Sequence, residues 1–394
     1  MTHTRRNGWF GVTAVAVGSF GTVLSEFLPI GLLPSISRDL GVSIGVAGLM
    51  VVVTGLAAAV AAPVITVASS RLDRKVVLIG LSAVLVVADV VGATAGAFPV
   101  LLLSRVLLGV ALGGFWAVGL GVAPRLVAPA ESIRAASLIT AGISVATVVS
   151  LPLGAFIATT ASWRLAFAIG AGLGMIALVL QLIALPALPS EQRVRPAALM
   201  ALFTVPRARV GLIVAALLFA AQFAAYTYIS PFLEDTARIS PDVVTVALLV
   251  FGVAGIAGNF AAGATLDRSV SCTLVAGGLV LAAAVALLPL VAHLPVAVFV
   301  LLVAWGLVWG GLPLALQTWM VSALPEGAEA GMAMFVTTIQ VALAVGSTLG
   351  GVAVTVSGIG VDFSFAAILA VLGTTAVILL GLRSVRRPAA VTHH

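Results

Sequence analysis

Residues 99–123 read PVLLLSRVLLGVALGGFWAVGLGVA and contain a single charged side chain, that of Arg105. An apolar stretch of about 20 residues is long enough to cross the hydrocarbon core of a membrane as an α-helix. The rest of the chain has the same character: 62% of its 394 residues are hydrophobic and 8% are charged, against roughly 25% charged in ordinary soluble domains. This composition excludes a soluble enzyme and predicts a membrane protein with several spans.

Similar apolar runs recur along the whole sequence. They cover residues 9–33, 42–67, 76–97, 99–123, 135–160, 165–187, 210–232, 243–265, 271–292, 295–319, 330–356 and 361–382. The 41 Gly and only two Tyr favour helices packed through small residues over a transmembrane barrel, which has short alternating segments and aromatic girdles. The predicted fold class is therefore all-α: a polytopic membrane protein of twelve transmembrane helices.

The basic residues predict the orientation of these helices. If both termini are cytoplasmic, the inner segments hold Arg5, Arg6, Arg71, Arg74, Lys75, Arg125, Arg134, Arg193, Arg195, Arg207, Arg209, Arg268, Arg383, Arg386 and Arg387. The outer loops then hold Arg38, Arg164 and Arg238. This bias follows the positive-inside rule and predicts a multi-pass protein of the inner (cell) membrane with both termini in the cytoplasm. Because the basic residues are scattered singly, no nucleic-acid partner is expected.

The sequence contains little that could support catalysis. Cys272 is the single cysteine, and the four histidines form no cluster suited to a metal. No G-x-x-x-x-G-K-[ST] loop occurs, which excludes ATP as the energy source in this chain. We therefore expect no enzyme activity, no cofactor and no metal.

A less apolar segment divides the chain. Residues 188–209 contain three prolines and several charges, and they predict a cytoplasmic linker between six-helix bundles at 1–187 and 210–394. The halves carry matching motifs: Leu72-Asp73-Arg74 is repeated at Leu266-Asp267-Arg268, and Gly113-Gly114 at Gly310-Gly311. Two parallel repeats with a substrate site between them are typical of one large group of secondary transporters.

These motifs resemble those of the major facilitator superfamily, in its twelve-helix drug:proton antiporter branch. Ser70-Arg71-Leu72-Asp73-Arg74-Lys75 is similar to the family's loop between helices 2 and 3, and Arg105 followed by Gly109 is similar to its helix 4 motif. Ser162-Trp163-Arg164 with Phe167 resembles its entry into helix 6.

Within this branch the chain resembles bacterial sugar-efflux permeases and purine-ribonucleoside exporters. The likeness rests on Glu26-Phe27-Leu28-Pro29, Leu107 to Trp116, Gln222-Phe223 with Tyr226-Thr227-Tyr228, and Trp305-Gly306. It implies the major facilitator fold and a secondary exporter of a nucleoside- or sugar-like solute. Such a transporter works by alternating access, with proton antiport expected. Multidrug efflux and uncoupled facilitated transport remain alternatives, and a non-transporting sensor is a more distant one. The expected partners are a small-molecule substrate, protons and the lipid bilayer, and we expect a monomer.

Three charged residues lie well inside the predicted spans: Glu26, Asp89 and Arg105. Each is roughly 9–12 Å from the outer end of its helix at 1.5 Å per residue, so they could share one layer. Intramembrane charges are costly and usually mark functional sites, so all three are candidates for proton coupling, with Glu26 expected to pair with Arg105. The alternatives are a neutral hydrogen-bonded Glu26, a structural Arg105, and an Asp89 that is structural or reaches toward the membrane surface.

Aromatic and polar residues at helical spacing are candidates for substrate binding. They are Gln222, Tyr226, Trp305, Trp309, Thr337, Gln340 and Trp116. Rigid aromatic rings with a few hydrogen-bonding groups suit a planar polar solute, and they also suit amphiphilic drugs. The alternative is that the tryptophans pack the core, while hydroxyls such as those of Thr140, Ser144 and Thr147 bond their own backbone.

The charged loop motif and its repeat form a candidate gating loop, made of Arg71, Asp73, Arg74, Asp267 and Arg268. Asp73 is expected either to cap a neighbouring helix or to pair with an arginine and so latch the cytoplasmic gate. The alternative is that the loop is simply a basic anchor on the inner side.

Overall fold

The computed structural model describes residues 2–189, 204–266, 269–324 and 328–381. The first half contains α1 (Thr2–Leu40), α2 (Ile44–Ala47), α3 (Leu49–Ala68), α4 (Arg74–Ala93), α5 (Phe98–Leu126), α6 (Ser132–Thr160) and α7 (Trp163–Ala184). The second contains α9 (Pro206–Thr227), α10 (Ile229–Pro231), α11 (Pro241–Leu266), α12 (Val270–Leu287), α13 (Pro295–Ala323), α14 (Ala328–Ser357) and α15 (Ile359–Ala376). Short 3₁₀ and π segments include η1 (Ser69–Arg71), η2 (Pro129–Glu131), η4 (Phe232–Thr236) and η5 (Val377–Gly381).

Within the described residues, twelve helical segments are long and apolar enough to span a membrane, which confirms the predicted number. The largest difference from the predicted runs is in α1, which continues past residue 33 to Leu40 with Pro29 and Pro34 inside it. It ends before Gly41, whose φ of 64° suits a residue without a side chain. Most of the predicted linker lies outside the described residues, and α9 begins at Pro206, where a proline suits the first helical turn.

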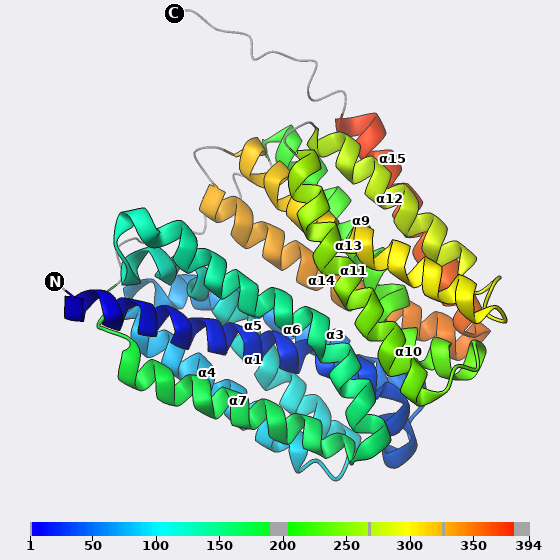
Figure 1. The fold of residues 1–394 in the computed structure, drawn as a ribbon, viewed down its shortest axis with the longest axis horizontal. Helices are drawn as coiled ribbons and strands as arrows, with labels where there is room; N and C mark the ends of the chain where they lie inside the picture. The colour runs from blue at the N-terminus through cyan, green and yellow to red at the C-terminus, as the bar shows by residue number, and fades with distance from the viewer. Residues whose placement is uncertain (1, 190–203, 267–268, 325–327, 382–394) are drawn as a thin grey trace, which may run out of the picture.

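The helices form two bundles, α1 to α7 and α9 to α15 (Figure 1). The bundles approach each other at the end that holds α2 and α10, and they diverge toward the end at which the N-terminus lies. We call these the Leu40 end and the Trp9 end, after residues near the two ends of α1.

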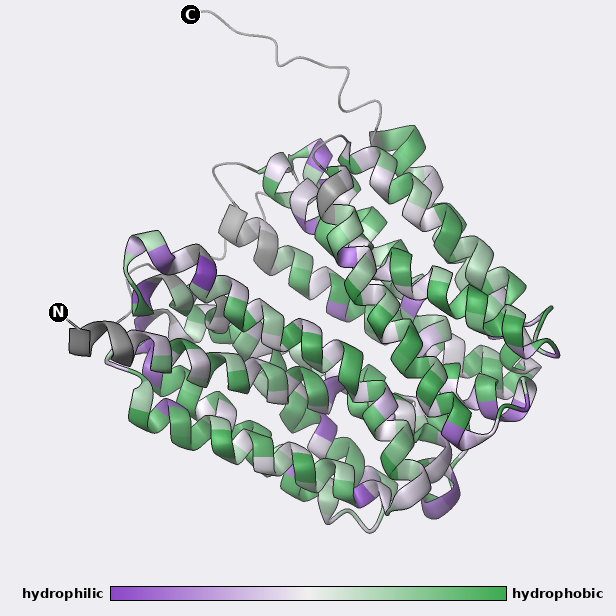
Figure 2. Ribbon diagram, in the orientation of Figure 1, coloured by the Kyte–Doolittle hydropathy of each residue, from purple (hydrophilic) through white to green (hydrophobic). Residues whose placement is uncertain are grey.

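The outer surface is apolar, as a lipid environment requires. Phe260, Val296 and Val356 are each more than 75% exposed. Hydrophobic residues cover the helices along their length, while hydrophilic ones gather mostly near helix ends and loops (Figure 2). A surface of this kind is stable in hydrocarbon and unfavourable in water.

Glycines allow close helix contacts inside each half. A Cβ at Gly113 of α5 would collide with the carbonyl of Ala58 on α3, and one at Gly346 of α14 would collide with the carbonyl of Ala220 on α9. These are the backbone approaches expected from small-residue motifs in membrane helices.

Candidate functional site

A buried polar cluster joins three helices of the first half. Arg105 Nη2 of α5 lies 3.4 Å from Asp89 Oδ1 of α4, and Arg105 Nη1 donates to the carbonyl of Ser25 on α1 at 2.9 Å. Ser25 Oγ completes the cluster by donating to Asp89 Oδ2 at 2.6 Å. The guanidinium also lies 4.7 Å from the ring centre of Phe167 on α7. Arg105 is thus held by a carboxylate, a carbonyl and an aromatic face.

The expected pairing of Glu26 with Arg105 is wrong, because Arg105 pairs with Asp89. Adjacent residues of a helix point about 100° apart, so Ser25 faces α4 and α5 while Glu26 faces elsewhere. The possibility that Asp89 reaches toward the membrane surface is also wrong, since its side chain is 1% exposed and bonded on both oxygens.

Glu26 instead reaches the second half. Its Oε1 accepts a hydrogen bond from Gln340 Nε2 of α14 at 3.3 Å, and Glu26 is only 7% exposed. Next to it, Phe27 stacks on Phe223 of α9 with ring centres 5.8 Å apart. A residue expected to couple protons and one expected to bind substrate therefore meet at the boundary between the bundles.

The aromatic candidates of the second half form one cluster on α9 and α13. Trp305 Nε1 donates to Gln222 Oε1 at 2.6 Å, and the rings of Tyr226 and Trp305 are 6.1 Å apart. Trp309 meets Phe219 edge-on at 4.9 Å. Gln222, Tyr226 and Trp305 are buried, whereas Trp309 is partly exposed. Within the described residues, Gln222 Nε2 has no hydrogen-bond partner and is a free donor inside this cluster.

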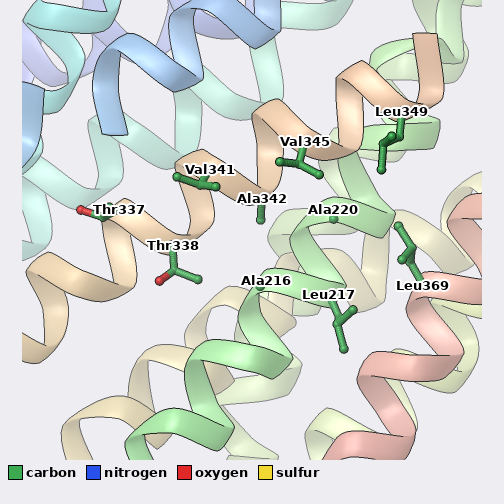
Figure 3. A pocket seen from close by; sticks show the side chains of 10 residues that line it. All are labelled: Ala216, Leu217, Ala220, Thr337, Thr338, Val341, Ala342, Val345, Leu349 and Leu369. Carbon is green, nitrogen blue, oxygen red and sulfur yellow. The ribbon is translucent and has the colours of Figure 1, made fainter. Parts of the chain in front are cut away.

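Two other candidates lie apart from this cluster. Thr337 lines an apolar groove of about 390 Å³ between α9, α14 and α15 (Figure 3). The other lining residues include Val341 and Leu349, which are 40% and 44% exposed, so the groove faces the membrane. Trp116 is partly exposed on α5, and no ring contact joins it to the cluster among the described residues.

The hydroxyls of α6 are not directed at a partner helix. Thr140, Ser144 and Thr147 each donate to the carbonyl four residues before them. This is the backbone bonding expected when such residues have no other role.

The charged loop is fastened within the first half. Asp73 caps α4 by accepting from the N–H of Lys75 at 2.8 Å, and it accepts from the N–H of Leu188, after α7, at 2.9 Å. Arg74 Nη1 donates to Ser69 Oγ at 2.9 Å, and Arg71 is exposed. Asp73 therefore acts as a helix cap and joins the loop to the end of α7. Asp267 and Arg268 lie outside the described residues.

The Leu40 end is closed by close packing between the halves. Tyr228, after α9, donates its hydroxyl to the carbonyl of Ser347 on α14 at 2.8 Å. A Cβ at Gly48, in the first half, would collide with that hydroxyl. A Cβ at Gly351 of α14 would lie 2.5 Å from it. A Cβ at Gly45 would reach 2.6 Å from the carbonyl of Gly351. We call this contact of α2 with α14 around Tyr228 the seam.

The sequence reasoning missed one buried acid. Asp362 of α15 is 0% exposed, and neither carboxyl oxygen has a hydrogen-bond partner among the described residues. It is the second residue of the last predicted run, 361–382, and so it is not among the charged residues predicted to lie well inside a span. One feature of the sequence could have singled out Asp362: no basic residue lies near it along the chain to pair with it.

Comparison with known proteins agrees with this architecture. Residues 15–346 match the family model described as Major Facilitator Superfamily. The chain is 37% identical to the "Transcription regulatory protein OpdE" of Pseudomonas aeruginosa, over 87% of this chain and 86% of that one. It is 34% identical to the "Purine ribonucleoside efflux pump NepI" of Escherichia coli, over 88% of each chain.

Solved structures share the fold at low sequence identity. A structure of the nucleoside transporter NupG superposes with a TM-score of 0.78 at 14% identity, covering 95% of this chain and 99% of that one. A D-xylose-proton symporter gives 0.77 at 15% identity, with coverage of 94% and 97%. The twelve spans, the two bundles and the match over most of the sequence lead to one conclusion: the chain belongs to the major facilitator superfamily of membrane transporters.

Proposed function

We propose that this protein exports a small, planar, polar solute of the purine-nucleoside type from the cytoplasm in exchange for protons, acting as a monomer. The observation that carries the proposal is the contact between Glu26 and Gln340. It places an acid where two halves that move relative to each other meet.

The orientation follows from the basic residues. The loop holding Arg71, Arg74 and Lys75 lies at the Trp9 end, where positive charge favours the cytoplasm. The Leu40 end then faces outward and is the closed end. In this orientation the protein has its bundles parted toward the cytoplasm, one of the two conformations that alternating access requires.

Proton coupling is assigned to Glu26 because of its surroundings. An ionised carboxylate is costly in an apolar layer unless it is paired, and its partner here is the neutral amide of Gln340. When the halves move apart, this bond breaks and the acid meets water or substrate. The same acid is thus exposed to different surroundings in the two conformations. Arg105 and Asp89 support it by fixing α1 through Ser25.

The substrate class follows from the aromatic cluster. Phe223 and Trp309 offer ring faces and edges, and the amide donor of Gln222 has no partner among the described residues. Stacking combined with directional hydrogen bonds suits a purine nucleoside. The 34% identity with a protein named as a purine ribonucleoside efflux pump supports the same class. Sugar-like solutes, amphiphilic drugs and uncoupled transport are the competing outcomes.

The test uses purified protein in liposomes with a pH gradient and radiolabelled inosine, and it follows nucleoside and proton movement together. Wild type should exchange the two. Glu26→Gln should keep nucleoside binding but lose substrate-dependent proton movement. Asp242→Asn, which alters an exposed acid in the first turn of α11, should behave as wild type. Proton movement at the wild-type rate in Glu26→Gln would overturn the assignment of coupling to Glu26.

A second candidate is a membrane sensor, favoured by the 37% identity with a protein named as a transcription regulatory protein. A sensor would bind solute without moving it. Saturable binding of inosine in detergent, with no movement in liposomes under any gradient, would support this candidate over export.

A further inference from the structure

We propose that Asp362 is a second proton-binding site, which takes up a proton when the Leu40 end closes and releases it when that end opens. The inference rests on the proposed function only in taking the Leu40 end as one that opens during transport. It concerns an acid other than Glu26, and its readout does not require substrate.

The first support is the burial of the carboxyl group. Asp362 is fully buried, and both of its oxygens lack hydrogen-bond partners among the described residues. Arg105, by comparison, buries its charge with a carboxylate and a carbonyl. An unpaired carboxylate in the interior of a membrane bundle is strongly unfavourable, whereas the neutral acid is tolerated. In this closed arrangement the group therefore carries its proton.

The second support is the position of Asp362 behind the seam. Oδ1 lies 2.6 Å from where a Cβ of Gly350 would be, and that Cβ would also approach the carbonyl of Ala224 on α9 at 2.9 Å. The next residue of α14, Gly351, accommodates the hydroxyl of Tyr228 and packs against Gly45 of α2. The acid and the contact between the halves thus lie against consecutive glycines, about 100° apart around α14.

The third support is that no compensating cation lies beside Asp362 in the described parts of the helices around it. Tyr228 packs its hydroxyl against Gly351, next to the glycine that faces Asp362, and that hydroxyl is already donated to the carbonyl of Ser347. On the neighbouring α9, Arg207 and Arg209 lie in the first turn, at the far end of the helix. On α12, Cys272 is exposed near the start of the helix. The described part of α14 around Gly350 carries no charged residue. Phe363, the next residue, packs on Phe232 at 4.6 Å.

The consequence is a linkage between pH and the seam. A deprotonated Asp362 requires water or a cation, and either one requires α14 to separate from α9 at Gly350 and Ala224. The hydroxyl of Tyr228, which follows α9, packs against both Gly351 of α14 and Gly48 beside α2, so that separation also disturbs the seam. One proton released per opening makes the ratio of open to closed protein rise by up to about tenfold per pH unit.

The test measures the seam directly. Spin labels on Val46→Cys of α2 and Ser357→Cys at the end of α14, in a Cys272→Ser background, report the distance between the halves in the full chain in lipid nanodiscs. Val46 and Ser357 are exposed, so the labels should disturb the packing little. Without substrate, wild type should show short distances at about pH 5 and a growing long-distance population toward about pH 9.

Variants test the part played by Asp362. Asp362→Asn and the smaller Asp362→Ser should keep short distances at every pH, because neither can ionise. Asp242→Asn, which alters an exposed acid away from both sites, should respond to pH as wild type does. A wild-type response in both Asp362 variants would overturn the inference.

An infrared measurement tests the proton itself. At about pH 5 the wild-type-minus-Asp362→Asn spectrum should contain the C=O stretch of a buried carboxylic acid, and this band should disappear as the long distances appear. Absence of the band would overturn the inference. Failure of nucleoside-proton exchange in liposomes would leave these results unchanged, so the two proposals fail separately.

Discussion

The Nε2 atom of Gln340 lies 3.3 Å from Oε1 of Glu26, so a side chain of α14 donates a hydrogen bond to an acid of α1 across the boundary between the bundles. Removing this hydrogen bond should favour separation of the halves. A buried hydrogen bond is worth about 1 kcal/mol, which is about a fivefold change in an equilibrium. Gln340→Ala should therefore raise the open-to-closed ratio at the Leu40 end about fivefold in the spin-label measurement. Thr338→Ala, altered on the membrane-facing groove of the same helix, should leave it unchanged. Equal ratios in wild type and Gln340→Ala would show that the bond contributes nothing to closure.

The cluster of Asp89 and Arg105 should act on stability. Arg105→Ala leaves a buried carboxylate without its cation, which typically costs about 3–5 kcal/mol. The double variant Asp89→Leu with Arg105→Met removes both charges and should recover most of that loss. Thermal unfolding of purified protein in detergent measures both effects. Asp39→Ala, which breaks a partly exposed ion pair with Arg164, should cost far less. A double variant no more stable than Arg105→Ala would contradict this interpretation.

The two roles of Asp73 can be separated by substitution. Asp73→Ala removes both the cap of α4 and the bonds to the N–H of Leu188. Loss of the cap alone should cost about 1 kcal/mol. Asp73→Ser keeps a capping oxygen on a shorter side chain, so it should recover the cap without reaching Leu188. Unfolding free energies should rank wild type above Ser and Ser above Ala. Equal values for Ser and Ala would show that the cap adds little.

Glu234, in the π-helical turn outside the spans, should make stability depend on pH. Partial burial raises the pKa of its carboxyl above 4.5, with Asp235 adding to the shift and Arg38 opposing it. A raised pKa means that the folded state binds the proton more tightly than the unfolded chain does. Stability should therefore fall as pH rises above about 4.5. Glu234→Gln should unfold at a higher temperature than wild type at pH 7, and the difference should disappear near pH 4. A difference that persists at pH 4 would point to packing instead of charge.

The number of spans and the small-residue contacts could be predicted because both depend on local composition. A run such as 99–123 spans a membrane whatever surrounds it. Gly113 permits a close backbone approach whichever helix is its partner. These features require no knowledge of which helices are neighbours.

Contacts between side chains could not be predicted in the same way. Glu26 and Arg105 share a depth along the membrane, but the partner of each depends on the rotation of α1, which the apolar pattern does not specify when a helix is buried on most sides. The same limit hid Asp362. Asp362 is the second residue of the run 361–382, and its burial depends on how α14 crosses α9 at Gly350.

Ser25 and Glu26 are consecutive residues, yet one is bonded to Asp89 and Arg105 inside the first half while the other is bonded to Gln340 in the second. A rotation of α1 about its own axis would carry both side chains together, so it could not release Gln340 without also breaking the bonds at Ser25. Glu26 can separate from Gln340 with the bonds at Ser25 intact when the first half moves as one body relative to α14. The movement that breaks this contact is then one between the halves, and α1 keeps its position within the first half.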